Sequence, residues 1–72
     1  MTGKFSAYHF AQEIQRQRVS HDLTQQELAE KLHCTVRCIQ KWESGESLPR
    51  IDALFELAQV FSVSVDTFLG LG

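Results

Sequence analysis

The chain has 72 residues, of which 43% are hydrophobic and 22% are charged, which is a globular rather than a disordered composition. A chain of this length folds as one domain and has little room for a deep enzyme cleft. No apolar run approaches the roughly 18 residues that a membrane-spanning helix needs, and residues 1–10 are too polar for a signal peptide. We therefore expect one cytoplasmic domain over residues 1–72, disordered at 1–5 and frayed at 70–72.

The net charge of −2 is unevenly distributed along the chain. All seven basic residues and six of the nine acidic residues lie in residues 1–50, which therefore have a charge of +1. Residues 51–72 contain three acidic residues and no basic one, which gives −3. Nucleic-acid-binding proteins usually have the opposite sign, so any DNA-binding face must be a weakly basic one in the first part of the chain.

The first predicted helix is capped by Ser6 and runs to about Val19. Phe10 and Ile14 are four residues apart, which places both on one apolar stripe of the helix. The polar side chains around this stripe are expected to face water; they are Gln12, Glu13, Gln15 and Arg16.

Thr24 opens the second predicted helix, which ends at Leu32 or at the residue after it. Thr24 and Glu27 have the spacing of a capping box, in which each side chain satisfies a backbone amide at the helix start. Leu23 and Leu28 fit the hydrophobic staple that flanks such a cap.

Three more helices are predicted from caps and apolar spacing. The third begins after Thr35 and ends at about Trp42 or Ser44, the fourth covers about Ile51 to Phe61, and the fifth is capped by Ser64. No segment alternates as a strand would. The predicted fold class is all-α, a compact bundle of five short helices.

A tight turn at His33 and Cys34 joins the second and third predicted helices, which is the arrangement of a helix-turn-helix. Ala29 is small where these two helices must approach closely. Apolar side chains fill the space beneath them: Leu28, Leu32, Cys34, Ile39 and Trp42. The outer face of the third helix is left free, and a DNA major groove is wide enough to admit one helix.

This pattern resembles the Cro/repressor-type helix-turn-helix family of bacterial and phage regulators. The residues that match are Leu23–Ala29, Leu32, Ile39 and Trp42–Gly45. The resemblance extends from about Phe10 to Leu69 and is strongest from Gln25 to Ser44. It implies a lambda-repressor-like fold and a sequence-specific DNA-binding transcriptional regulator, with repression by blocking polymerase as the simplest mechanism.

The resemblance also implies which residues contact double-stranded DNA. Gln25 matches a phosphate contact at a helix start, where free backbone amides add to the binding. Arg37 matches a base-reading position, and its two hydrogen bonds to a guanine would give about 1–3 kcal/mol of discrimination, while Val36 would contact a thymine methyl group. The complete expected set is Gln25, Thr35, Val36, Arg37, Gln40, Lys41 and Arg50.

Arg18 and Glu43 match two positions that form an internal ion pair in part of the family. The pair would clamp the third helix; the alternative is two unrelated surface charges.

Three turn positions at which the family often has glycine hold Asp22, His33 and Ser62. These residues are expected to adopt the left-handed conformation at some cost in stability.

The loop after Gly45 departs from the family, which often has lysine or arginine where this chain has Glu46, Ser47 and Leu48. A glutamate there repels phosphate, so we expect weak nonspecific DNA binding and a shallow salt dependence. The acidic loop and the negative net charge favour an alternative function. The same fold would then serve as a protein-interaction module, antitoxin-like or adaptor, with weak or no DNA binding.

Cys34 and Cys38 are four residues apart. Their main interpretation is structural, as small apolar side chains, with a redox-sensing or metal site as the alternatives. Tetrahedral zinc would need further ligands, and the three histidines have no ligand spacing. No set of nucleophile, base and oxyanion site is recognisable. We therefore expect neither enzymatic activity nor a metal or cofactor.

Leu69 and Leu71, at the end of the chain, are candidates for a dimer face. Regulators of the family commonly bind near-palindromic sites as dimers, with half-sites about 34 Å apart. The alternative is a monomer.

Overall fold

A computed structural model describes residues 6–70 and confirms an all-α bundle, with five helices and no strand in this range. The helices are α1 (Ala7–Ser20), α2 (Gln25–Leu32), α3 (Val36–Glu43), α4 (Ile51–Phe61) and α5 (Val65–Leu69). Within the described range, each helix falls short of the length and apolar character needed to cross a membrane. The expectations for residues 1–5, 71 and 72 lie outside the described residues.

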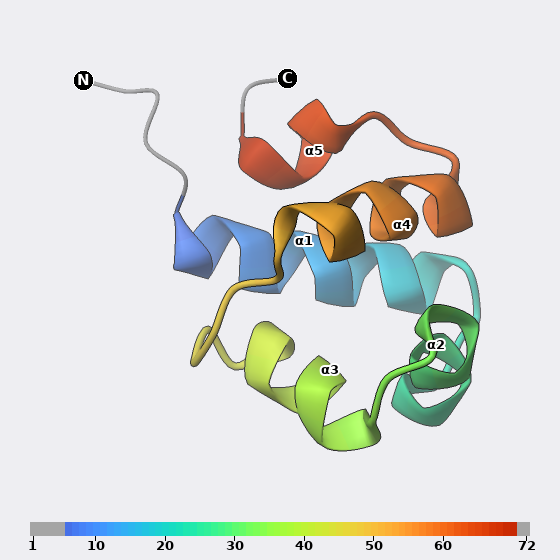
Figure 1. Cartoon of the computed structure of the whole chain (residues 1–72). Coiled ribbons are helices and arrows are strands. Elements are labelled where there is room, and N and C mark those ends of the chain that lie inside the picture. The colour runs from blue at the N-terminus through green and yellow to red at the C-terminus, as the bar shows by residue number, and fades with distance from the viewer. Residues whose placement is uncertain (1–5, 71–72) are drawn as a thin grey trace.

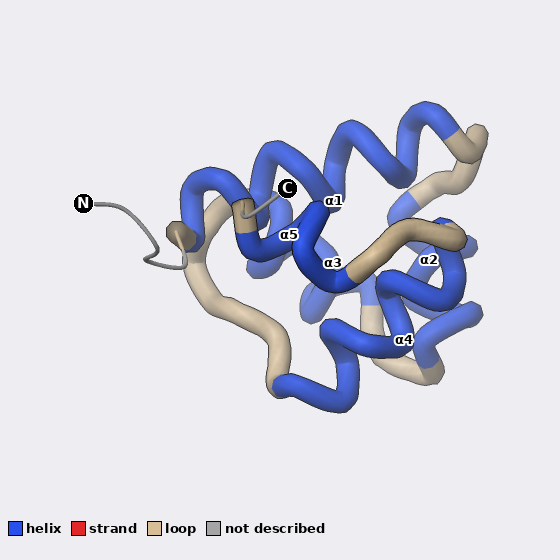
Figure 2. Tube along the Cα trace, turned by 90° about the horizontal axis from the view of Figure 1, so that it is seen from above, coloured by secondary structure: helices blue, strands red, loops and turns tan. Residues whose placement is uncertain are grey.

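The helix α1 crosses the middle of the molecule, with α2 and α3 below it and α5 above it in Figure 1. It packs directly against α3 and α5. The helix α4 packs against α2 and α5, and the view from above in Figure 2 shows it along the edge opposite α1. Both α1 and α4 therefore support the pair α2–α3, which forms one end of the bundle.

Aromatic side chains connect the helices through the core. The ring of Phe10 in α1 meets Trp42 of α3 edge-on, at 6.3 Å between ring centres, and lies 5.8 Å from Phe68 of α5. Phe68 lies 6.3 Å from Phe61 of α4. Phe10, Phe61 and Phe68 are fully or almost fully buried, so this chain of contacts fixes α3 against the rest of the bundle.

The predicted helix starts are correct, but one cap differs from the expectation. Ser6 accepts a hydrogen bond from the amide of His9 and so caps α1. Ser64 precedes α5 as predicted, yet its side chain makes no capping hydrogen bond. The start of α5 is therefore fixed by packing, since Phe68 is buried in the core.

Glu13 is buried, and the expectation that it faces water is wrong. Only 4% of the residue is exposed, and its carboxylate accepts hydrogen bonds from Arg16 and, at 2.9 Å, from Gln17 Nε2. Burial alone would raise the pKa of Glu13, but these hydrogen bonds outweigh it and hold the pKa below its ordinary value. The cause of the burial is α5, which packs on α1 and brings Thr67 and Gly70 beside Glu13.

Three helices are followed by a non-glycine residue in the left-handed conformation, as predicted. These residues are Asp22, His33 and Ser62, with φ of 58°, 57° and 57°. After each one, the amide of the next residue donates to the carbonyl five positions earlier at 3.0 Å. This is the Schellman pattern, in which glycine is usual because a Cβ is unfavourable at positive φ.

Replacing Ser62 by glycine is expected to stabilise the fold. The Ser62 side chain is exposed and forms no hydrogen bond within the described residues, so Ser62→Gly removes only the strain of a left-handed serine. We expect a gain of about 1 kcal/mol, or roughly 4–8 °C in Tm for a domain of this size, measured by thermal and urea unfolding. Ser62→Ala retains the Cβ and is the matched control. Equal stability of the two variants would contradict the prediction.

Candidate nucleic-acid interface

Local hydrogen bonds define the start of each of the two helices α2 and α3. At the start of α2 the predicted capping box is present: the amide of Glu27 donates to Thr24 Oγ1 at 3.0 Å, and the amide of Thr24 donates to Glu27 Oε1 at 2.8 Å. At the start of α3 the Oγ1 of Thr35 accepts from the amide of Cys38 at 3.2 Å. Ala29 is 1% exposed, as expected for a residue at the helix crossing. The chain therefore forms the predicted helix-turn-helix.

The outer face of α3 carries Arg37, Gln40 and Lys41. Their spacing of three and four residues places them side by side on the helix. Arg37 and Gln40 are exposed and Lys41 is half-buried. Within residues 6–70, none of the three side chains forms a hydrogen bond or an ion pair. This face therefore has donors available for an external ligand.

Val36 is less accessible than expected for a residue that contacts DNA. It is half-buried and packs against the core, although it was expected to contact a thymine methyl group. The first turn of α3 lies close enough to its neighbours for a valine at this position to share their apolar surface. Thr35 is exposed, and its hydroxyl is already used as the cap of α3. Contacts of these two residues with DNA remain predictions.

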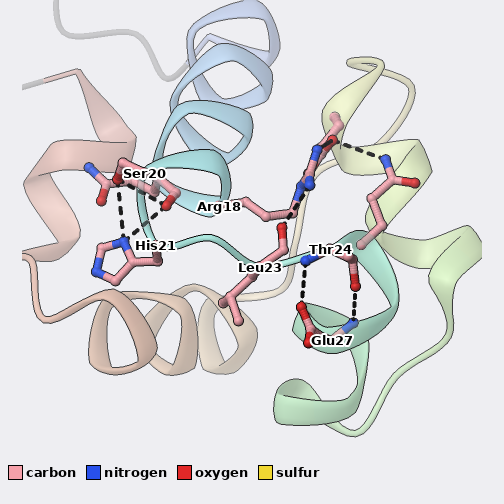
Figure 3. A network of polar contacts seen from close by, with 9 residues as sticks. Arg18, Ser20, His21, Leu23, Thr24 and Glu27 are labelled. Carbon is pink, nitrogen blue, oxygen red and sulfur yellow. Dashed lines mark hydrogen bonds and ion pairs between the residues drawn. The ribbon is translucent and has the colours of Figure 1, made fainter.

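Arg18, in the last turn of α1, forms the predicted ion pair with Glu43 of α3. Arg18 Nε donates to Glu43 Oε2 at 2.7 Å, and Arg18 Nη2 donates to Glu43 Oε1 at 3.2 Å. The remaining nitrogen, Nη1, donates to the Leu23 carbonyl at 2.9 Å (Figure 3). The side chains of Arg18 and Glu43 are only 15% and 6% exposed. The alternative of two unrelated surface charges is therefore wrong.

The same carboxylate also holds Gln25, a contact that sequence reasoning missed. Gln25 Nε2 donates to Glu43 Oε1 at 3.0 Å. An amide nitrogen has two hydrogens, so one remains available at the start of α2. The spacing of 18 residues between Gln25 and Glu43 is not a helical or strand period. No local sequence pattern could therefore have revealed this contact.

The end of α3 also has a Schellman turn, at Gly45 with φ of 80°. The amide of Glu46 donates to the Lys41 carbonyl at 2.9 Å, and the amide of Gly45 donates to the Trp42 carbonyl at 3.2 Å.

The side chain of Arg50, the next expected DNA contact, is 92% exposed, and its Nε lies 4.0 Å from Asp52 Oδ1. Arg50 is therefore held only loosely by the rest of the protein.

Cys34 and Cys38 are free, half-buried thiols that line one open groove of about 430 Å³ together with Trp42 and Leu48. Burial raises the pKa of Cys34 from an ordinary 9.0 to about 11, and the neighbouring Cys38 adds to the shift. A thiol with this pKa is protonated at neutral pH and reacts slowly. Within the described part of the chain, no three His, Cys, Asp or Glu side chains are grouped to hold a metal ion.

Comparisons with known proteins agree with this geometry. The helix-turn-helix family model HTH_3 matches residues 14–68. The chain is 38% identical over 60 residues to the HTH-type transcriptional activator BcrR of Enterococcus faecalis, and the match covers 83% of the chain and 29% of BcrR. It is 30% identical over 57 residues to the cryptic phage CTXphi transcriptional repressor RstR of Vibrio cholerae, covering 79% of the chain and 51% of RstR. The chain thus spans about half or less of these relatives.

Solved structures show the same fold. A transcriptional regulator from Listeria innocua is 34% identical with a TM-score of 0.80, and the match covers 85% of this chain and 57% of that one. The hydroxypropylphosphonic acid epoxidase of S. wedmorenis is 24% identical with a TM-score of 0.83, and the match covers 92% of this chain and 35% of the epoxidase. At that identity, the likeness to the epoxidase concerns the fold alone.

Removing one partner of the Arg18–Glu43 pair is expected to destabilise the protein strongly. Arg18→Met leaves the Glu43 carboxylate buried without its cation and should cost about 3–5 kcal/mol. The double variant Arg18→Met with Glu43→Leu should cost less than the two single changes together, because no charge is left buried. Urea unfolding followed by the fluorescence of the single tryptophan, Trp42, measures all of these variants.

Lys31→Met is the control for this series, because Lys31 is exposed and has no acidic partner in the described residues. It should change stability by less than about 0.5 kcal/mol. An Arg18→Met cost as small as this would show that the ion pair makes no net contribution.

Cys34 is expected to react slowly with iodoacetamide in the folded protein. Because only the thiolate reacts, raising the pKa from 9.0 to about 11 lowers the reactive fraction about 100-fold at pH 8. The Cys38→Ser variant leaves only Cys34 and removes the contribution of Cys38, but burial, the largest cause of the raised pKa, remains. The alkylation rate of this variant should therefore still be rising above pH 9. The same variant unfolded in urea is the reference. A folded-state rate that levels off near pH 9 would contradict the prediction.

Proposed function

The chain belongs to the Cro/repressor-type helix-turn-helix family of transcriptional regulators, and we propose that it binds double-stranded DNA sequence-specifically and acts as a repressor. In this proposal α3 enters the major groove and reads base edges. The start of α2 and Arg50 contact the phosphate backbone. Blocking of polymerase at the bound site is the simplest mechanism for the domain.

The observation that supports this proposal most strongly is the pairing of the cations. Six lysine and arginine side chains lie in the described residues. Three of them are matched with acidic partners: Arg16, Arg18 and Arg50. The other three have no such partner, and two of these, Arg37 and Lys41, lie on the outer face of α3. The unpaired positive charge is thus concentrated on the helix that family members use to bind DNA.

Arg37 is better placed than Lys41 to read a base, because it is exposed and lies in the first turn of α3. Its guanidinium can donate two parallel hydrogen bonds to O6 and N7 of guanine. Gln40 and Lys41 lie one turn further on, where they can reach a neighbouring base or phosphate. Val36 and Thr35, at the start of the helix, complete this surface.

Gln25 is positioned for a phosphate oxygen at the start of α2. The hydrogen bond to Glu43 orients its amide and leaves one N–H for DNA. The free backbone amides of the first turn of α2 add donors for the same anion. Because Glu43 also binds Arg18, the position of Gln25 depends on the ion pair that fixes α3.

Two copies would bind a two-fold symmetric site, with half-sites about 34 Å apart. Each copy offers only a few cations, so affinity for DNA of unrelated sequence should be low and should fall modestly with salt.

The alternative of a protein-interaction module is favoured by the exposed acidic residues Glu46, Asp52 and Glu56. Binding of DNA by α3 distinguishes the two functions.

Replacing Arg37 and Lys41 by alanine is expected to abolish DNA binding without unfolding the protein. Amide NMR spectra of the labelled protein with mixed-sequence duplex DNA at about 50 mM salt should show shifts at Gln25, Arg37, Gln40 and Lys41, and these should fade at about 200 mM. On a specific site, Arg37→Ala should cost about 1–3 kcal/mol, and Lys41→Ala should weaken binding evenly across sequences.

Lys31→Ala is the matched control, because it removes an unpaired cation from α2 instead of α3. It should leave binding to a specific site nearly unchanged. Loss of binding to the same extent in Lys31→Ala and Arg37→Ala would indicate only nonspecific attraction. An α3 face that shows no shift even at low salt would contradict the proposed function.

A further inference from the structure

Two thiols meet in the groove between the helix-turn-helix and the loop that leads into α4. Cys34 lies directly before Thr35, the cap of α3, and Cys38 lies in the first turn after it, with its amide bound to Thr35 Oγ1 at 3.2 Å. Both thiols are free and half-buried, and both line the open groove of about 430 Å³. A hydrogen bond joins the two side chains. The groove therefore presents two sulfur atoms side by side, within reach of a solute.

The charges that line this groove favour a cation. Asp52 and Glu56 of α4 are exposed carboxylates on its wall, and Arg50 is the basic residue beside them. Arg50 Nε lies 4.0 Å from Asp52 Oδ1, whereas Glu56 forms no ion pair within residues 6–70. The negative charge of Glu56 is near enough to Cys34 to raise the pKa of the thiol. A cation held by the two sulfurs would be attracted by the same charge.

The number of ligands limits which ion the two sulfurs can hold. Thiolates select soft ions, and Cu(I), zinc and the iron of iron–sulfur clusters are the common ones in proteins. Structural zinc takes four ligands, and iron–sulfur clusters are held by four cysteines or by a mixed set of cysteine and histidine. Among the residues that the structure describes, no three His, Cys, Asp or Glu side chains are grouped to hold a metal ion. Cu(I) has a single charge and a filled d shell, and it is held by two sulfur ligands alone.

We propose that Cys34 and Cys38 bind one Cu(I) ion in this groove as its two thiolate ligands. On binding, two S–Cu bonds replace the two S–H bonds, both protons pass to solvent, and the copper remains Cu(I) throughout. The need for further ligands, which counts against zinc, does not arise for a two-coordinate ion. The site is independent of the proposed contact with DNA, and the tests below contain no DNA.

Apolar side chains form much of the remaining wall of the groove. They include Leu32, Trp42 and Leu48, of which Leu32 and Trp42 are only 7% and 6% exposed. Such a wall limits the access of water to a bound ion. Water and carboxylate oxygen are hard ligands and compete poorly with sulfur for a soft ion. The groove is therefore better suited to Cu(I) than to a hard cation such as Mg²⁺ or Ca²⁺.

The first test is a competition for Cu(I) between the complete chain and the chromogenic chelator bicinchoninate, without oxygen and without added thiols. We expect one ion per chain. Cys34→Val, which keeps an apolar side chain against the core, and Cys38→Ser should each lower the affinity at least about 100-fold, because the second sulfur otherwise binds at a high effective concentration. The fluorescence of Trp42, the single tryptophan, should change on binding because Trp42 lines the groove.

His33→Asn is the matched control for the cysteine variants. His33 is exposed and directly precedes Cys34, and asparagine tolerates the left-handed backbone at this position. The change removes an imidazole but neither thiol, so the affinity for Cu(I) should be nearly unchanged. Thermal unfolding shows whether each variant is folded. The second test needs no variant: one equivalent of Cu(I) should shift the amide NMR signals of residues 34–42 and 47–56 and leave those of α5 in place.

Each remaining outcome overturns the proposal. A folded cysteine variant that keeps the affinity of the unchanged chain would show that its thiol is not a ligand. An equal loss in His33→Asn would indicate coordination by histidine. One ion for every two chains would place the metal between copies, and Zn(II) bound as tightly as Cu(I) would indicate a site with more than two ligands. Amide shifts confined to residues outside the groove would place the ion elsewhere.

Discussion

The orientation of α3 depends on one buried carboxylate, that of Glu43. It receives two hydrogen bonds from Arg18 and one from Gln25, and Arg18 also binds the Leu23 carbonyl. The ion pair therefore connects the end of α1, the turn before α2, the start of α2 and the end of α3. A charge that is 6% exposed is tolerated only because all of these donors reach it. The helix that we propose to face DNA and the amide that we propose to bind phosphate are thus held by the same side chain.

Apolar packing and strained turns complete this arrangement. Trp42 is the neighbour of Glu43 on α3, and its contact with Phe10 holds the inner side of the helix. Asp22, just before α2, and His33, just after it, have left-handed backbones. Both turns cost free energy, yet they allow α2 to be only eight residues long and still pack against α3. The left-handed turns therefore lower the stability of the domain, and between them lies the short helix that supports α3.

The helices α3 and α4 present surfaces of different charge. Unpaired positive charge is found on α3, whereas α4 presents Ile51 and Phe55 with acidic residues beside them. The Schellman turn at Gly45 and the loop after it redirect the chain between these surfaces. The curated relatives include both an activator and a repressor, which is consistent with a common DNA-binding unit whose effect depends on the remainder of each protein.

The sequence by itself determined the local structure of this protein. Caps such as Thr24, turn residues such as Gly45 and apolar spacing act within about five residues, so they predicted the helices and the helix-turn-helix. The Arg18–Glu43 pair was predicted from family resemblance. Only the tertiary structure decided the burial of Glu13, the half-burial of Val36 and the hold of Glu43 on Gln25. These depend on which helix covers which face, and contacts between distant segments leave no period in the sequence.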